Sequence, residues 1–313
     1  MKNFLKISLL ISVFFYILYD IDYNLFFLNI SNYSILGIIF MLILVILPEV
    51  IFAYRWIYAT NENYNVLEAL KAHTLAGIAG LVAPMKLGEL APIWYLQKIH
   101  GVKTYSTFAT TIIVRMIDLV VLLSLGLLVT FLVFNNSDYQ IYSLVLLITL
   151  WIIIVVFFKY PKIAFVVCKF IPNRKLNAYL IKLIRIILHT IKLKNLTFLL
   201  IFTTLLWISF FAVTFVFLFY VAKFDLSIID FFVVFLVTSV GMAIPLAPSG
   251  FATYHASMIL SLGWYGISKD SALGAAIVLH VIQLSPSVVL YIVFFLFTKN
   301  KNILWRINDK KIM

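Results

Sequence analysis

The sequence predicts an all-α polytopic membrane protein with about six full transmembrane helices and two re-entrant helical hairpins in an inverted repeat. Three observations predict this fold. Hydrophobic residues make up 64% of the chain and charged residues only 12%, whereas soluble domains carry roughly 25% charged residues. Several apolar stretches are each long enough to cross a bilayer. Two further apolar stretches are broken by proline and glycine at corresponding places in the two halves of the chain.

The composition also limits the possible functions. Lys and Arg outnumber Asp and Glu by 24 to 12, and in a membrane protein this excess reflects orientation and anionic lipids better than nucleic acid. Cys168 is the single cysteine, which excludes an intrachain disulfide or a thiolate metal cluster. The sequence contains no glycine-rich phosphate loop, no His-Glu-x-x-His and no Gly-x-Ser-x-Gly. We therefore expect no cofactor, no metal and no nucleic-acid partner.

A spanning helix needs about 20 mostly apolar residues. The candidate full spans are residues 4–22, 34–58, 105–134, 141–158, 196–222 and 273–298. The first follows basic residues, as a secretory signal does, but Asp20 and Asp22 come next in place of a small-residue cleavage site. We therefore expect it to remain as an uncleaved first span.

Basic residues orient these spans, because cytoplasmic loops carry the excess of Lys and Arg. Residues 20–33 and 135–140 contain neither and are expected outside, whereas Arg55 and Lys71 place the end of the second span inside. The C-terminal tail is basic as well. The prediction is a multi-pass protein of the cell (inner or plasma) membrane with both termini in the cytoplasm.

The whole chain, residues 1–313, is predicted to be one membrane domain. Its first repeat covers residues 34–134 and its second covers residues 196–298, with a basic amphipathic cytoplasmic linker at 159–195 between them. Within the linker, basic residues share one helical face and aliphatic residues the other: Lys182, Arg185, His189 and Lys192 against Leu180, Ile184, Ile187 and Ile191. Such a helix lies flat at a membrane surface, either as an anchored linker, which we favour, or as a site that recruits anionic lipid.

Residues 66–100 and 228–263 are the two broken stretches. The first breaks at Pro84 and the second at Pro248, and each is about two short helices long. From the charge bias we expect the first stretch to enter and leave the membrane on the cytoplasmic side, and the second stretch to enter and leave it on the outer side. This arrangement is typical of a transporter site at the interface of inverted repeats. The alternative is two ordinary loops between short helices.

Ionisable side chains inside spans cost about 2.5 to 3.5 kcal/mol each and usually face a cavity or a partner. Arg115 and Asp118 lie at i, i+3 and can contact each other on one helix face. They form either a purely structural pair or a site in which Arg115 also contacts Glu89 or a lipid phosphate. Glu49 is a further carboxylate that could pair with Lys86 or Arg115.

His255 and His280 lie in the outer half of the second repeat. Two histidines without a nearby carboxylate or cysteine make a poor metal site, so they are expected to be satisfied core residues or a polar pair. Ser249 and Ser285 lack a convincing base, which leaves nucleophilic catalysis without support.

The motifs also resemble a known family. Pro84-Met85-Lys86-Leu87-Gly88-Glu89, then Arg115-Met116-Ile117-Asp118, then Pro245-Leu246-Ala247-Pro248-Ser249-Gly250 with Gly263 beyond, resemble the lysylphosphatidylglycerol synthetase transmembrane region, a flippase-like membrane family. The likeness covers about residues 34–298. It implies a stand-alone member, without a synthetase domain, that handles anionic or aminoacylated phospholipids. The matching positions are Gly88, Glu89, Arg115, Asp118, Pro248 and Gly250.

The chain departs from the family's pattern at three places. Pro92 stands where the family tends to have arginine, and Ala252 and His255 stand where it usually has glycine and glutamate. His280 stands where a basic residue is often found. The two histidines could substitute there as a polar pair.

The leading expectation is a phospholipid, or lipid-linked intermediate, flippase or transporter. Lys86, Glu89 and Arg115 would contact the headgroup from the cytoplasmic half of the membrane. Backbone groups and half-helix ends at Pro248, Ser249 and Gly250 would contact it from the outer half. Gly88 and Asp118 complete the candidate substrate-binding residues.

Two further functions stay open. One is a membrane-embedded enzyme or accessory subunit that modifies lipids or lipid-linked glycans, with Glu89 or Asp118 as general base. The other is a regulatory or scaffolding membrane subunit that binds a stable partner protein.

Overall fold

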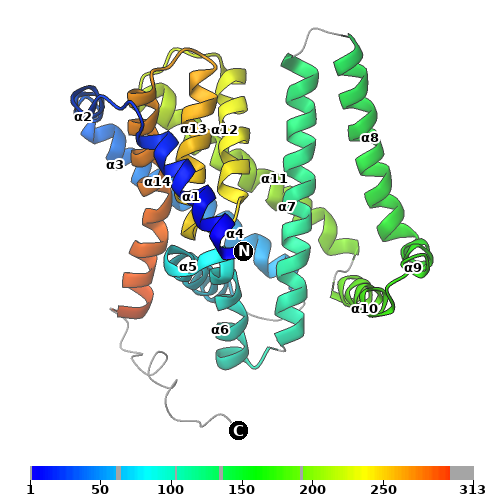
Figure 1. Cartoon of the computed structure of the whole chain (residues 1–313). Coiled ribbons are helices and arrows are strands. Elements are labelled where there is room, and N and C mark those ends of the chain that lie inside the picture. The colour runs from blue at the N-terminus through cyan, green and yellow to red at the C-terminus, as the bar shows by residue number, and fades with distance from the viewer. Residues whose placement is uncertain (1, 61–64, 103, 134–136, 191–192, 297–313) are drawn as a thin grey trace.

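The computed structural model of the chain describes residues 2–60, 65–102, 104–133, 137–190 and 193–296, and all regular structure within them is helical (Figure 1). Five of the helices in these ranges are long and apolar enough to cross a membrane: Ile35–Ala59, Thr107–Val133, Asp138–Val156, Asn195–Val221 and Lys269–Phe294. They coincide with five of the six predicted spans. The chain is therefore a polytopic all-α membrane protein.

The elements follow one another along the chain with short connections. In order they are α1 (Lys2–Leu18), α2 (Tyr23–Ser31), α3 (Ile35–Leu44), α4 (Ile46–Ala59), α5 (Val66–Val82), η1 (Pro84–Leu90), α6 (Ala91–His100), α7 (Thr104–Val133), α8 (Ser137–Lys159), α9 (Pro161–Lys169), α10 (Arg174–Thr190), α11 (Leu193–Val216), η2 (Phe217–Val221), α12 (Ile228–Ala243), η3 (Pro248–Gly250), α13 (Thr253–Gly263), α14 (Lys269–Tyr291) and η4 (Ile292–Leu296).

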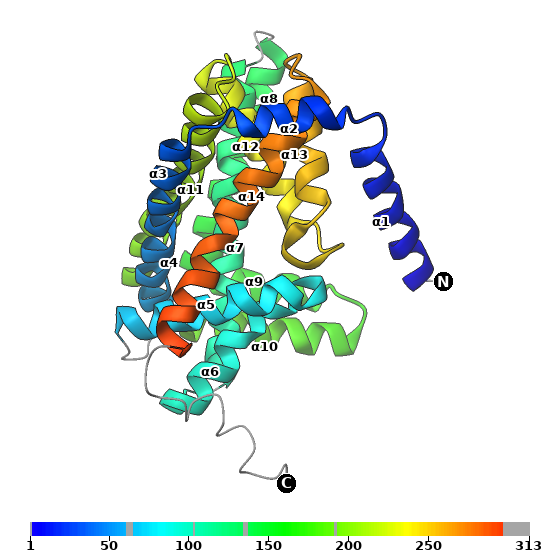
Figure 2. The same cartoon turned by 90° about the vertical axis from the view of Figure 1, so that its left-hand side faces the viewer.

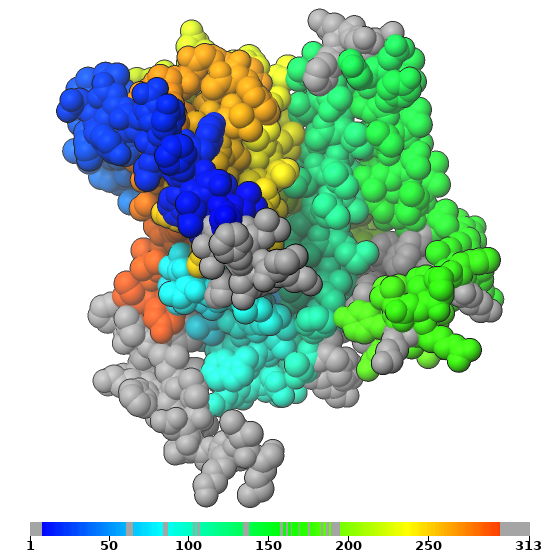
Figure 3. All heavy atoms as spheres, in the orientation of Figure 1, coloured from blue at the N-terminus to red at the C-terminus, as the bar shows by residue number. Residues whose placement is uncertain are grey.

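The first predicted span, residues 4–22, differs from the structure. α1 ends at Leu18, and the chain bends by 75° into α2. Asp20 adopts a positive φ of 58°, which ends the helix, and the Asp22 carboxylate accepts hydrogen bonds from two backbone N–H groups in the first turn of α2. The acidic residues that argue against a cleavage site thus also start a new helix, in a segment predicted to be an outer loop. In Figure 3, α1 lies on the front of the molecule beside α13, where the rings of Phe14 and Phe251 are 5.9 Å apart.

Both broken stretches form a helix, a break and a second helix, with the bounds expected from the sequence. α5, η1 and α6 make the first hairpin, and α12, η3 and α13 make the second. The two breaks contact each other, and the Ser249 hydroxyl in η3 donates a hydrogen bond to the Gly80 carbonyl in α5 at 3.1 Å. Figures 1 and 2 show the two hairpins approaching this junction from opposite ends of the molecule. Their entry into a membrane from opposite faces stays a prediction.

The helices around the hairpins pack as two apolar clusters. One gathers α11 to α14 with the N-terminal helices, around fully buried side chains such as Phe217, Met258 and Leu279. The other gathers α4 to α7 with α11, around side chains such as Leu96 and Leu199. α14 and α5 join the two clusters, and Figure 2 shows α5 crossing α14. The hairpin junction therefore lies between two separately packed halves.

The segment between the halves leaves this core. α8 buries few of its residues in the protein, as expected of a helix that faces lipid (Figure 1). α10 follows it and is amphipathic: Lys182 and Arg185 are exposed, whereas Leu180 and Ile184 are half-buried. The side chains of Ile187 and His189, and residues 191–192, lie outside the described part of the chain. The division into two repeats and a linker stays a prediction.

A carboxylate ties the two ends of the first hairpin together. Glu68, near the start of α5, accepts hydrogen bonds from Lys71 Nζ at 2.6 Å and from the Tyr95 hydroxyl at 2.8 Å, and lies 3.1 Å from Nε2 of His100. It lies outside the five spanning helices. Burial acts to raise the pKa of the Glu68 carboxyl, but these hydrogen bonds and the Lys71 charge outweigh it and hold the pKa below its usual value of 4.5.

We expect Glu68→Gln to destabilise the protein by about 1 to 2 kcal/mol at neutral pH, because it removes charge-assisted hydrogen bonds. A lowered folded-state pKa means that this stabilisation is present above pH 4.5 and is lost as the pH falls through the folded-state pKa. Thermal unfolding in detergent, followed from neutral to acid pH, should therefore show a smaller fall in unfolding temperature for Glu68→Gln than for the wild type. Parallel curves would contradict this assignment.

Candidate functional site

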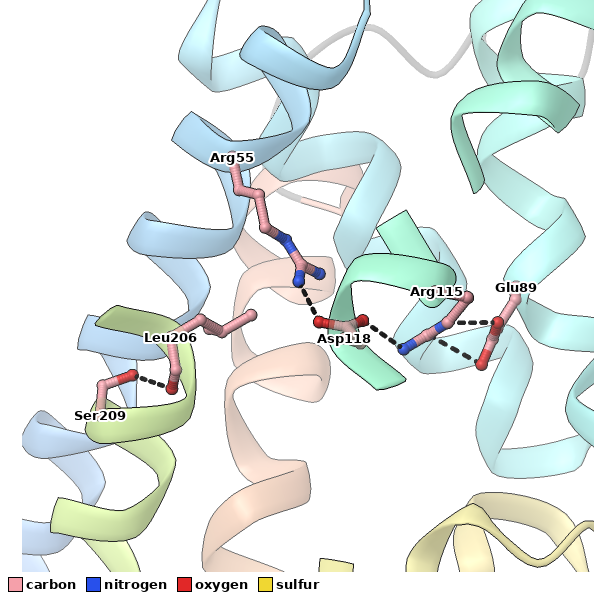
Figure 4. A network of polar contacts seen from close by, with 6 residues as sticks. All are labelled: Arg55, Glu89, Arg115, Asp118, Leu206 and Ser209. Carbon is pink, nitrogen blue, oxygen red and sulfur yellow. Dashed lines mark hydrogen bonds and ion pairs between the residues drawn. The ribbon is translucent and has the colours of Figure 1, made fainter. Parts of the chain in front are cut away.

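Four charged side chains form a continuous network beside the hairpin junction (Figure 4). Arg115 on α7 makes a two-point contact with Glu89 in η1, with Nε–Oε2 at 2.9 Å and Nη2–Oε1 at 2.8 Å. Its Nη1 also lies 3.2 Å from Oδ2 of Asp118, one turn along α7. The other oxygen of Asp118 accepts a hydrogen bond from Arg55 on α4. Arg115 therefore pairs with both carboxylates, as one of the two sequence-based alternatives predicts.

The network runs from the protein interior towards an accessible surface. The Arg55 side chain is 1% exposed and that of Asp118 is 10% exposed, whereas Arg115 is 51% exposed. Both oxygens of Asp118 are occupied by arginine. The Arg55 end of the network is therefore built as a buried ion pair, and the Arg115 end can be reached by a ligand.

A cavity of about 230 Å³ lies where the two hairpins meet. Glu89 and Arg115 line it, and so do Ser249 and Gly250 from the second break. Both breaks lie against α5 at Gly80. A Cβ at Gly88 in the first break would lie 2.3 Å from the Gly80 backbone nitrogen, and Ser249 in the second break donates its hydrogen bond to the Gly80 carbonyl. Of the remaining predicted site residues, the side chain of Lys86 lies outside the described part of the structure.

The second break needs an unusual backbone. Ser249 and Gly250 both have positive φ, 51° and 71°, and Pro248 opens this turn. His280 Nε2 lies 3.2 Å from the Ser249 carbonyl oxygen, and the rings of His255 and His280 are 5.0 Å apart. The two histidines are therefore neighbours, and one of them contacts the turn. A search of the described residues finds no group of three metal-ligating side chains.

A further pair, Glu49 with His73, lies beside the cavity, which His73 lines, and the sequence did not predict it. Glu49 Oε2 lies 3.0 Å from Nε2 of His73, on α5, and not beside Arg115, one of the two partners considered from the sequence; the side chain of the other, Lys86, lies outside the described part of the structure. The His73 ring stacks on the Phe52 ring, with centroids 3.5 Å apart. The Arg55 guanidinium also lies over the Phe52 ring. The sequence does single out Arg55, because it is a charged residue in an apolar helix. From the sequence we use it only to orient the second span. His73 gives no comparable signal in the sequence.

The comparison with protein-family models decides the relationship. Residues 3–290 match the model described as the lysylphosphatidylglycerol synthase TM region. The chain belongs to this family. The resemblance found from the motifs is therefore confirmed, and the match begins earlier in the chain than the motifs do. A search of curated proteins finds no match. Within the family's transmembrane region, the network at Arg115 and the cavity beside it are the features from which a function can be argued.

Proposed function

We propose that this protein moves a phospholipid, or a lipid-linked intermediate, between membrane leaflets, with the headgroup passing through the cavity between the two hairpins. The observation that carries the proposal is the position of Arg115. Its guanidinium is half-exposed in an otherwise largely apolar cavity that both breaks help to line. A largely apolar cavity that contains an accessible arginine suits an anionic headgroup, aminoacylated or not.

The contact between Arg115 and Glu89 suggests how a headgroup would bind. A guanidinium holds carboxylate and phosphate with the same two-point geometry. A lipid phosphate can therefore replace the Glu89 carboxylate on Arg115, so that the arginine stays paired before and after the exchange. Lys86 in the same break would add positive charge, and Gly88 lets the break lie against α5. Asp118 would hold Arg115 in place throughout.

The second break would complete the path from the other side. Pro248, Ser249 and Gly250 place turn backbone, instead of helix, beside the cavity, and such backbone is tolerated at membrane depth only where it lines a cavity or is covered by protein. The proposed topology is an inverted repeat in a cell (inner or plasma) membrane, with both termini in the cytoplasm and the hairpins re-entering from opposite faces. Rocking of the two halves about the hairpin junction would expose the cavity to one side at a time.

The alternative of a membrane-embedded enzyme has less support. A general base needs a carboxylate that is free to take a proton. Both oxygens of Asp118 contact arginine, and both oxygens of Glu89 contact Arg115. Mass spectrometry of the membrane lipids separates the alternatives, because an enzyme adds or removes a lipid species whereas a transporter changes only its leaflet distribution.

The transport proposal is tested in proteoliposomes that contain fluorescent phosphatidylglycerol. The double variant Glu89→Ala, Arg115→Ala should move the lipid at least about tenfold more slowly than wild type, because a lost charge-assisted contact costs about 1.5 to 3 kcal/mol. Arg115→Lys keeps the charge but loses the two-point geometry, so its rate should be intermediate. Lys182→Ala, which removes an exposed charge on α10, is the control and should match wild type. Equal rates for wild type and the double variant would refute the proposal.

A further inference from the structure

A second cavity, of about 250 Å³, adjoins the first. Its wall comes from α4 and α11 to α14. Met242 and Leu284 line both cavities, so the two cavities share part of their walls.

Glu49 and His73 lie at the boundary between the cavities. Glu49 lines the second cavity and His73 lines the first, yet their nearest atoms are 3.0 Å apart. Among the described residues, no Lys or Arg lies within ion-pair distance of Glu49, unlike Glu89 and Asp118, which arginines hold. Within the described residues, Glu49 is therefore an interior carboxylate whose neighbour, His73, can itself gain or lose a proton.

The second cavity also provides sites for water. Glu49 Oε2, Trp207 Nε1 and the Tyr254 hydroxyl are buried and make no aligned hydrogen bond within the described structure. Native proteins satisfy such groups with ordered water, for which a cavity of this size has room. Hydroxyl groups of Thr238 and Ser239 line the same wall. Water held here can carry protons to Glu49.

The groups that face the pair from neighbouring elements do not compete with it. Arg55 on α4 and Arg115 on α7 are paired with Asp118 and Glu89. From α13 the second cavity receives only the phenol of Tyr254, and from α11 and α14 it receives Trp207 and Gln283, which do not titrate. Protonation at this boundary therefore falls to Glu49 and His73.

We propose that Glu49 and His73 form a proton-binding pair that connects the two cavities, and that the proton is the coupling ion of this protein. A proton from water in the second cavity binds the Glu49 carboxylate and passes to neutral His73, which gives an imidazolium beside a carboxylate. The imidazolium then releases a proton to water in the first cavity. One proton crosses the boundary and Glu49 is again a carboxylate. His73 accepts the proton on Nε2, the nitrogen beside Glu49, and gives up the proton on Nδ1, so its ring must flip before the next transfer. The coupling rests on the proposed transport function, whereas the proton binding does not.

An infrared pH titration of the purified protein tests the binding site directly. The wild type should show a protonated-carboxyl carbonyl band on acidification that contains a component absent from Glu49→Gln. In His73→Gln the pH dependence of that component should change, because Glu49 has lost its protonatable neighbour. Glu68→Gln is the matched control: Glu68 also lies 3.1 Å from a histidine, His100, but lines neither cavity, so the Glu49 component should remain.

Identical band titrations in wild type and Glu49→Gln would overturn the proton-binding pair. If Glu49→Gln does not fold, His73→Gln serves as the test instead. A carboxyl band that titrates in His73→Gln as it does in the wild type would also overturn the proton-binding pair. In proteoliposomes, a pH gradient should speed lipid movement by the wild type but not by Glu49→Gln. A wild type that moves lipid at the same rate with and without a gradient would overturn the coupling. One that moves no lipid at all would instead overturn the proposed function, and the infrared titration would still decide the proton site.

Discussion

Asp118→Ala should destabilise the protein by about 3 to 5 kcal/mol, among the largest effects of any single substitution, because it leaves the charge of Arg55 buried without a partner. The Arg55 side chain is 1% exposed, and Asp118 is its acidic partner among the described residues. Water cannot replace the carboxylate without opening the packing between α4 and α7. Unfolding by heat or by denaturing detergent, with the protein in mild detergent micelles, measures the loss.

Removing the other partner of this ion pair, Arg55, should cost less stability, because the network supplies Asp118 with a second arginine. Arg55→Met leaves Asp118 still paired with Arg115 at 3.2 Å, so no carboxylate is stranded. We therefore expect Arg55→Met to cost less than Asp118→Ala. The double variant Arg55→Met, Asp118→Ala should be more stable than Asp118→Ala alone, because it removes the unpaired charge as well. Two single effects that simply add in the double variant would contradict the role assigned to this ion pair.

The lengths of the apolar stretches and the positions of the helix breakers were enough to predict five of the spans and both broken stretches. Long apolar stretches alone predict the five spans. A helix breaker, at Pro84 or Pro248, within a stretch too short to cross the membrane twice predicts each of the two hairpins. The first span is bent and not one straight helix, for a local reason. Its end depends on the backbone conformation at Asp20 and on a cap from Asp22, and an apolar count ignores both. α1 is long and apolar enough to cross a membrane only together with α2, from which the bend at the acidic residues separates it.

The candidate site was predictable only where its residues are close in sequence or share a motif. Arg115 and Asp118 are one helical turn apart, and the Gly88-Glu89 motif placed Glu89 near them. The pair of Arg55 with Asp118 joins residues 63 positions apart, and its geometry is set by the packing of α4 on α7. The pair of Glu49 with His73 likewise depends on how α4 packs on α5. Such contacts follow from tertiary structure, which a single sequence does not give.

Gly88→Ala should be about as damaging as the loss of Asp118, for a steric reason. A Cβ at this position would lie 2.3 Å from the backbone nitrogen of Gly80, 2.6 Å from its Cα and 2.7 Å from the carbonyl carbon of Ala79. All three atoms belong to the backbone of α5 and cannot move aside as the end of a side chain can. Either η1 separates from α5 or α5 deforms, at a cost of about 3 kcal/mol.

The same displacement would also change the cavity. Glu89 follows Gly88 directly, so moving η1 away from α5 moves the carboxylate that holds Arg115. We therefore expect Gly88→Ala to lower the unfolding temperature in detergent and to slow lipid movement by the protein that remains folded. Gly126→Ala is the matched control, because its added Cβ meets nothing within 4 Å and alanine is about 1 kcal/mol better than glycine inside a helix. If Gly88→Ala proved as stable as Gly126→Ala, η1 could not pack against α5 as described. The assignment of η1 to the lining of the cavity between the hairpins would then be wrong.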